Sequence, residues 1–108
     1  MKKGEICLIE LPVSSGQEQE GLRPAILFAD TEIGIITVIP LTSNLQALRF
    51  QHTYTIEKSK ANGLSADSAA LIFQLRAIDS KRIKKKIGDL ESKHLQKINE
   101  LVIKYLAL

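Results

Sequence analysis

The run Ile35-Ile36-Thr37-Val38-Ile39 decides the fold class of this 108-residue chain. All of its residues are β-branched, and such side chains favour strands because they pack well on a pleated surface. Ile33-Gly34 supplies a turn before the run, and Pro40, which has no backbone N–H to donate to a sheet, follows it. We therefore expect a strand that stops at Pro40.

Short apolar runs of the same kind lie on both sides of this strand. We expect further strands at Gly4 to Leu11, Ala25 to Ala29, Thr53 to Glu57, Ser68 to Phe73 and Leu75 to Ile78. The last two are close enough to form one long strand with a bend or bulge, whereas the mixed polarity between residues 42 and 51 predicts a loop. Asn62-Gly63 is a turn signal. This succession of short strands predicts a mainly β protein built as a small barrel.

The pattern changes after the last predicted strand. Ile83 and Ile87 are four residues apart among basic residues, which predicts a short surface helix that ends at Gly88. Ser92 is the expected N-cap of a second helix, because apolar residues then recur at helical spacing at Leu95, Ile98, Leu101, Val102, Tyr105 and Leu106. We expect this C-terminal amphipathic helix to pack on the barrel.

Length and composition fit one domain spanning residues 1–108. The chain has a mass of 12.0 kDa and 44% hydrophobic residues, enough for one small core. Its single cysteine, Cys7, lies in an apolar run, so we expect a buried structural thiol, no disulfide framework and no multi-cysteine metal site. No segment approaches the roughly 20 apolar residues that span a bilayer, and a reducing cytoplasm is the expected location.

Charge is unevenly distributed along the chain. The net charge is +3, yet residues 1–40 contain three basic and six acidic residues, whereas residues 41–108 contain twelve basic and six acidic residues. The basic part fits a polyanion or an acidic partner protein, and it fits a solvated lysine-rich surface equally well.

The polar segment Gly16 to Pro24 is longer than a simple hairpin needs, and it is the first candidate site. Pro24 pushes the residue before it into an extended conformation, which fixes Arg23 where the next strand starts. A fixed guanidinium can hold a phosphate through two parallel hydrogen bonds. Taken alone, an Arg-Pro pair at a strand start is also commonly part of a surface ion pair.

The segment Pro40-Leu41-Thr42-Ser43-Asn44 is the second candidate, because two hydroxyls and an amide follow the end of a buried strand. Small donors at that position can grip phosphate oxygens. Taken alone, Thr-Ser-Asn after a strand is commonly a turn.

Several segments occur here in an order and spacing known from one family: Gly4-Glu5-Ile6, Gly16 to Pro24, Pro40-Leu41-Thr42-Ser43, Asn62-Gly63-Leu64 and Gln74-Leu75-Arg76-Ala77-Ile78-Asp79. With them the chain resembles the MazF/PemK toxins from about Lys3 to the terminal helix. The pairing of Glu-Gln-x-Gly-x-Arg-Pro with Gln-x-Arg-x-Ile-Asp is fairly specific. The resemblance implies a small SH3-like barrel of six or seven strands with a short helix and a C-terminal amphipathic helix.

The resemblance further implies the toxin of a type II toxin-antitoxin system. Such a toxin is a homodimeric endoribonuclease that cleaves single-stranded RNA at short sequences, without a metal or other cofactor, and is neutralised by an antitoxin with an acidic tail. The ribose 2′-hydroxyl attacks the adjacent phosphate and leaves a 2′,3′-cyclic phosphate and a 5′-hydroxyl end. Arg23 and Thr42 match the family's catalytic arginine and threonine.

The implied mechanism also needs a proton acceptor. Arginine stays protonated and is a poor base, so another group must take the 2′-hydroxyl proton, and Glu18 is the candidate. Some relatives carry a histidine where this chain has Gln17, and an acidic residue where it has Phe73. Catalysis mainly by positioning is therefore the alternative to Glu18. His52 and His94 match no catalytic position and are expected to be surface residues.

The remaining candidates are expected to bind RNA rather than to react with it. Gln74 and Arg76 match groove positions, and the loop from Thr42 to His52 is expected to help select bases; the full expected set is Gln17, Gln19, Ser43, Arg49, Phe50, Gln74 and Arg76. Phe50 fits stacking on a base and core packing equally well. For the basic run Lys81 to Lys86 we favour a solvated face.

A second function class remains open from the sequence. A toxin of the same fold that acts on a protein such as gyrase, or a degenerate member that only binds its antitoxin, would share the barrel, because fold does not fix function. Retention of Arg23 and Thr42 favours the ribonuclease, since a pure binding module would not need them.

Overall fold

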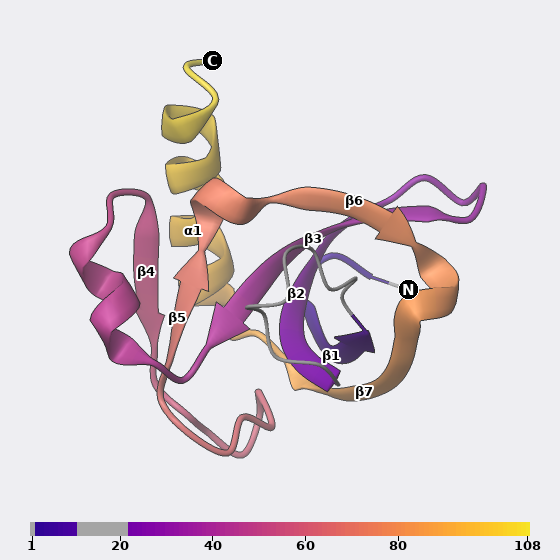
Figure 1. The fold of residues 1–108 in the computed structure, drawn as a ribbon, viewed down its shortest axis with the longest axis horizontal. Helices are drawn as coiled ribbons and strands as arrows, with labels where there is room; N and C mark the ends of the chain where they lie inside the picture. Colours follow the sequence, from indigo (N-terminus) through magenta and orange to yellow (C-terminus); the bar gives the residue numbers. More distant parts are fainter. Residues whose placement is uncertain (1, 11–21) are drawn as a thin grey trace, which may run out of the picture.

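The computed structural model describes residues 2–10 and 22–108. Within these residues, seven strands form one antiparallel sheet that curls into a half-barrel, with a single α-helix beside it (Figure 1): β1 (Glu5–Glu10), β2 (Leu22–Asp30), β3 (Ile35–Thr42), β4 (Thr53–Ile56), β5 (Ser68–Leu71), β6 (Arg76–Asp79), β7 (Ile83–Asp89) and α1 (Ser92–Tyr105). The expected mainly β class and the C-terminal amphipathic helix are confirmed. No helix in these two described ranges is long and apolar enough to cross a membrane.

The strand order is β4-β5-β3-β2-β1-β7, and β6 pairs additionally with β3. One edge of β3 pairs with β2, while its other edge pairs first with β6 and then with β5. A short 3₁₀ helix, η2 (Ile72–Gln74), separates β5 from β6. The region expected to be either two strands or one bent strand is therefore two strands that share one edge of β3.

Side chains from β1 to β3 divide between two apolar cores. Ile26 of β2 belongs to a core that also contains Ile98 and Val102 of α1. Its neighbours Ala25 and Leu27 belong to a second core, with side chains from β1, β3 and β6. Because successive side chains of a strand point to opposite faces, the same three strands supply both cores.

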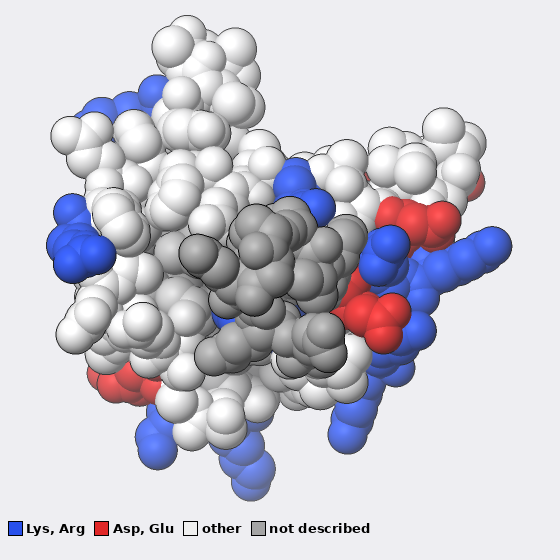
Figure 2. Space-filling model, viewed as in Figure 1, with Lys and Arg blue, Asp and Glu red and all other residues white. Residues whose placement is uncertain are grey.

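The expected helix around Ile83 and Ile87 is wrong, because this segment is strand β7, which pairs with β1. A spacing of four residues satisfies the periods of a helix and of a strand alike, so pairing with β1 decides the conformation. A 3₁₀ turn, η3 (Ser80–Arg82), precedes the strand. In Figure 2, basic side chains gather on the β7 side of the molecule, with acidic side chains among them.

An ion pair fastens β7 to β1. Lys86 Nζ lies 3.0 Å from Glu5 Oε2 and 3.1 Å from Asp89 Oδ1. The backbone N–H of Lys2 also donates to Glu5 Oε1. The hydrogen bonds from Lys2 and from Lys86 together hold the pKa of Glu5 below its ordinary value.

The structure differs from expectation at the end of β3, in the loop that follows it and at the start of α1. β3 continues past Pro40 to Thr42, because Pro40 stands at the last position of the β2–β3 ladder, where a missing N–H costs least. The expected loop contains a 3₁₀ helix, η1 (Leu45–Arg49), whose N-cap Asn44 accepts a hydrogen bond from the Gln46 N–H. The N-cap of α1 is Glu91 rather than Ser92, and its side chain makes no capping bond.

Candidate active site

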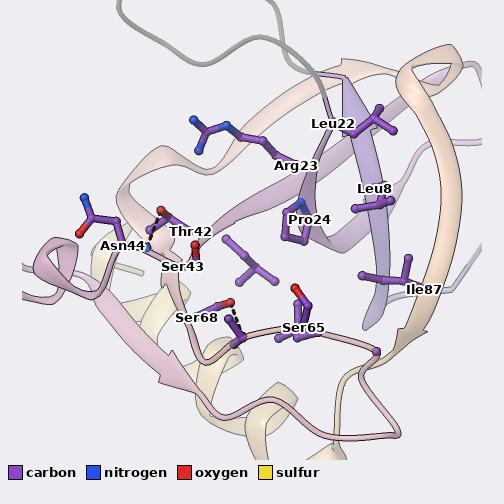
Figure 3. A pocket seen from close by; sticks show the side chains of 14 residues that line it. Leu8, Leu22, Arg23, Pro24, Thr42, Ser43, Asn44, Ser65, Ser68 and Ile87 are labelled. Carbon is purple, nitrogen blue, oxygen red and sulfur yellow. Dashed lines mark hydrogen bonds between the residues drawn. The ribbon is translucent and has the colours of Figure 1, made fainter.

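A cleft of about 730 Å³ opens where β2 begins and β3 ends. Its described lining comes from both strands, from the loop before β5, and from β1 and β7: Leu8, Leu22, Arg23, Pro24, Leu41, Thr42, Ser43, Asn44, Gly63, Leu64, Ser65, Ala66, Ser68 and Ile87. Figure 3 shows these side chains around the opening. The two candidate segments of the sequence thus meet at one site, as far as they are described.

Arg23 and Thr42 lie on neighbouring strands just beyond the end of their common ladder. The β2–β3 ladder pairs Ile26 with Ile39 and ends at Ala25 and Pro40, and Arg23 and Thr42 each lie two residues further along their strands. In Figure 3 the Arg23 side chain extends from β2 toward the β3 side of the cleft, where Thr42 lies. Arg23 lies within a strand, in agreement with the extended conformation expected before Pro24.

Local hydrogen bonds order the polar groups at the end of β3. Thr42 Oγ1 accepts the backbone N–H of Asn44 at 3.1 Å, which leaves the hydroxyl hydrogen of Thr42 for another acceptor. The carboxamide of Asn44 in turn caps η1 through the N–H of Gln46, also at 3.1 Å. Ser43 is exposed at the cleft. Small donors are therefore held close to the arginine by the turn that ends β3.

The electrostatic character of the cleft is simple. Arg23 carries the one charge among the lining residues that the structure describes. The β1 and β7 side is apolar, with Leu8 and Ile87, and Pro24 continues this surface. Over residues 2–10 and 22–108 there is no group of three or more His, Cys, Asp or Glu side chains placed to hold a metal ion. A cation beside an apolar wall suits an anionic group attached to a flat organic ring.

Sequence reasoning missed the wall opposite Arg23. Ser65 and Ser68 line the cleft there, and the Ser68 hydroxyl donates to the carbonyl of Ala66 at 2.9 Å. The Asn62-Gly63 turn signal marked this loop in the sequence but gave it no role. Its proximity to β2 and β3 is a product of tertiary packing.

The other expected RNA-binding residues lie outside the cleft lining. Arg49 and Phe50 are exposed at the end of η1, where the guanidinium lies 5.0 Å from the Phe50 ring centroid and that ring contacts Phe73 edge-on at 6.0 Å. Gln74 and Arg76 are exposed near the start of β6. Gln17, Glu18 and Gln19, which were also expected at the site, lie outside the described residues.

The two histidines are half-buried rather than simply exposed. His52 packs against Tyr105 with ring centroids 4.9 Å apart. The Tyr54 hydroxyl is 2.7 Å from Nδ1 of His94, and burial raises the pKa of Tyr54. Both contacts attach α1 to the β4 region, and neither histidine lines the cleft.

Comparison with known proteins decides the family. Residues 2–106 match the model of the PemK-like, MazF-like toxin of type II toxin-antitoxin systems. The chain belongs to the PemK/MazF toxin family. It is 28% identical to Endoribonuclease MazF of Staphylococcus saprophyticus over 94% of this chain and 88% of that protein. It is 30% identical to Endoribonuclease EndoA of Bacillus subtilis over 100% of this chain and 96% of that protein.

Solved structures share the fold of this PemK/MazF chain. MazF from Deinococcus radiodurans superposes with a TM-score of 0.79 at 18% identity, covering 100% of this chain and 97% of that one. A mycobacterial endoribonuclease in complex with its cognate antitoxin superposes with a TM-score of 0.72 at 13% identity, covering 98% of this chain and 94% of that one. The family resemblance stated from the sequence is thereby confirmed.

Proposed function

We propose that this chain is the toxin of a type II toxin-antitoxin pair and an endoribonuclease that cleaves single-stranded RNA at short sequences. Family membership and the endoribonucleases among its relatives support this activity. The observation that carries the proposal to particular residues is that Arg23 and Thr42 line one cleft, where β2 begins and β3 ends. The reaction is proposed to need no metal or other cofactor.

In the proposed reaction the ribose 2′-oxygen bonds to phosphorus while the bond from phosphorus to the 5′-oxygen breaks. The products are a 2′,3′-cyclic phosphate and a 5′-hydroxyl end. Negative charge builds on the non-bridging oxygens, where pre-placed donors give the largest stabilisation. The planar guanidinium of Arg23 offers paired N–H donors for those oxygens, and the Thr42 hydroxyl donates a further hydrogen bond.

Two proton transfers complete the reaction. A base must accept the 2′-hydroxyl proton, and the proposed base is Glu18, with positioning alone as the alternative. The leaving 5′-oxygen takes up a proton, for which Arg23 is the proposed donor. Ser43 is proposed to contact the same nucleotide in the cleft, and the flanking nucleotides are assigned to Gln17, Gln19, Arg49, Phe50, Gln74 and Arg76.

The activity is tested with purified protein and a varied set of single-stranded RNAs in the presence of EDTA. Arg23→Ala and Thr42→Val should each lower the cleavage rate by about 10²–10³-fold. Arg82→Ala removes an arginine outside the cleft and serves as the matched control, with an unchanged rate. The mapped 5′ ends should carry hydroxyls.

Two outcomes would reject the enzymatic proposal. Wild-type protein that leaves every RNA intact would contradict it directly. Growth arrest that persists in cells expressing the Arg23→Ala, Thr42→Ala double variant would favour a binding module that acts on a protein target.

The partners proposed for this toxin are an acidic-tailed antitoxin and a second copy of the chain, in the cytoplasm. A solved structure of the same fold is an endoribonuclease in complex with its cognate antitoxin, which supports the antitoxin as a partner. Exposed apolar side chains of η1 and at the end of α1 support the second: Leu45, Leu48, Ile103 and Leu106. Light scattering should give the mass of a dimer, and Ile103→Glu should shift it to that of a monomer.

A further inference from the structure

A fully buried asparagine holds the loop that forms the wall opposite Arg23. Asn62 has 0% exposure. Its Oδ1 accepts the backbone N–H groups of Ser59 and Leu64, both at 3.0 Å, and its Nδ2 donates to the carbonyl of Glu57 at 2.9 Å and to Glu91 Oε1 at 3.2 Å. These bonds use both acceptor positions and both donors of the carboxamide.

Glu91 closes this hydrogen-bond network from the other side. Its Oε2 accepts the Ser59 hydroxyl at 2.6 Å, and that same hydroxyl oxygen accepts the backbone N–H of Asn62 at 3.1 Å. Burial alone would raise the pKa of Glu91, but the hydrogen bonds from Ser59 and Asn62 outweigh it and hold the pKa below its ordinary value. The carboxylate is therefore ionised at neutral pH and ties the loop to the start of α1.

The loop backbone lies directly on the backbone of β7. A Cβ at Gly63 would overlap the carbonyl oxygen of Ile87, and a Cβ at Gly88 would overlap the backbone of Asn62. The N–H of Asp89 also donates to the carbonyl of Ala61 at 2.9 Å. No side chain separates the loop from β7 at these contacts. The loop can therefore shift only if β7 moves or the hydrogen bonds of the network break.

The cleft depends on this loop for one of its walls. Gly63, Leu64, Ser65 and Ala66 all line it, across from the end of β3. Leu64 is bonded to Asn62 through its backbone N–H, while its side chain packs in the core beside α1. Ser65 follows it, exposed at the cleft. Ser65 therefore comes directly after Leu64, whose backbone N–H is held by the Asn62 carboxamide.

We propose that Asn62, braced by Ser59 and Glu91, is a positioning residue that fixes the Gly63–Ala66 wall and thereby selects which nucleotide beside the scissile phosphate fits the cleft. This inference rests on the proposed ribonuclease activity. Asn62 itself does not touch the substrate. It acts through the wall, whereas Arg23 and Thr42 act on the phosphate.

The test compares cleavage of the preferred RNA site with cleavage of sites changed at one neighbouring nucleotide. The ratio of the two rates measures selectivity, and kcat and KM are measured at the preferred site. Asn62→Ala should lower the ratio about tenfold, the factor expected for losing one net buried hydrogen bond, mainly through KM. Glu91→Ala should do the same, while Glu91→Gln, which can still accept from Asn62 and donate to Ser59, should restore most of the ratio.

Ile36→Ala is the matched control, because Ile36 belongs to the second core, which contains no residue of the wall, so the cavity lowers the melting temperature without touching the wall. Its selectivity ratio should equal that of the wild type. If Asn62→Ala does not fold, Ser59→Ala removes two bonds of the network more mildly and takes its place. A wild-type ratio in the folded network variants, or an equal loss in Ile36→Ala, would overturn the inference while leaving the ribonuclease intact. Wild-type protein without any cleavage would instead reject both.

Discussion

Replacing Gly63 by alanine should destabilise the protein much more than the same replacement at Gly34. Both glycines have a positive φ, +70° at Gly63 and +94° at Gly34, so either alanine carries a backbone strain of about 1–2 kcal/mol. Space separates the two cases. The new Cβ at Gly34 has nothing within 4 Å, whereas the one at Gly63 falls well inside 3.0 Å of the Ile87 carbonyl oxygen.

Relief of that overlap requires a backbone movement, since the obstructing atom belongs to β7 rather than to a flexible side chain. Moving the loop away from β7 also stretches the hydrogen bonds of Asn62, each of which costs about 1 kcal/mol to lose. We therefore expect Gly63→Ala to lower the free energy of unfolding by about 3 kcal/mol more than Gly34→Ala does. For a chain of this size that difference corresponds to a melting temperature lower by roughly 12 °C or more.

Urea denaturation followed by circular dichroism measures both variants against the wild type. An unchanged slope of free energy against urea would show that the same folded and unfolded states are compared. If the two variants lose the same free energy of unfolding within about 1 kcal/mol, the idea that close backbone contact with β7 fixes the loop is refuted. Such a result would mean that the Gly63 loop moves off β7 at little cost.

Three further predictions follow from the buried groups. Glu5 and Glu91 have folded pKa values below the ordinary 4.5, so their stabilising contribution is present above that pH and is lost as pH falls through the folded values. Urea titrations at a series of pH values should show this loss of unfolding free energy, and Glu91→Gln should make the pH dependence weaker. Burial raises the pKa of Cys7, so a thiol reagent at pH 8 should modify it orders of magnitude faster in urea than in the native protein. Tyr54→Phe removes the bond to His94 and should lower the free energy of unfolding by about 1 kcal/mol in urea titrations, an effect that should vanish in a His94→Ala background.

The sequence pattern alone predicted those elements whose apolar spacing fits either a strand or a helix but not both. The β-branched run of β3 and the helical spacing of α1 each fit a single period, and both elements form, although the end of β3 and the N-cap of α1 differ from expectation. The segment of β7 failed because Ile83 and Ile87 fit two periods, and only its pairing with β1 chooses between them. Resemblance to the family placed Arg23 and Thr42 together, which the register of β2 and β3 supports.

The opposite wall of the cleft lay beyond what sequence pattern can predict. Asn62 next to a glycine is an ordinary turn signal, and most asparagines of such turns face solvent. Three hydrogen bonds of its side chain are to residues within five positions, but the fourth is to Glu91, 29 residues further along the chain. The same partnership explains the missed N-cap, because the Glu91 side chain is engaged with the loop and makes no cap bond to α1. Long-range polar networks of this kind leave no periodic trace in a sequence.

The position of the cleft follows from the way β3 changes partners. The ladder between β2 and β3 ends at Ala25 and Pro40, yet Arg23 remains paired with Ile9 of β1, and Thr42 with Ala69 of β5. Each of the two proposed catalytic residues is therefore held by its outer neighbour and not by the other, and both face the cleft.

Placement on strands also constrains how such a site can change. Donors aimed at a developing charge act best when they need no rearrangement, and strand pairing supplies that rigidity at both positions. A slip of one residue in either outer ladder would turn Arg23 or Thr42 to the opposite face of the sheet, into the region of the core beside α1. The register of β1–β2 and of β3–β5 is thus as necessary to the proposed chemistry as the two side chains themselves.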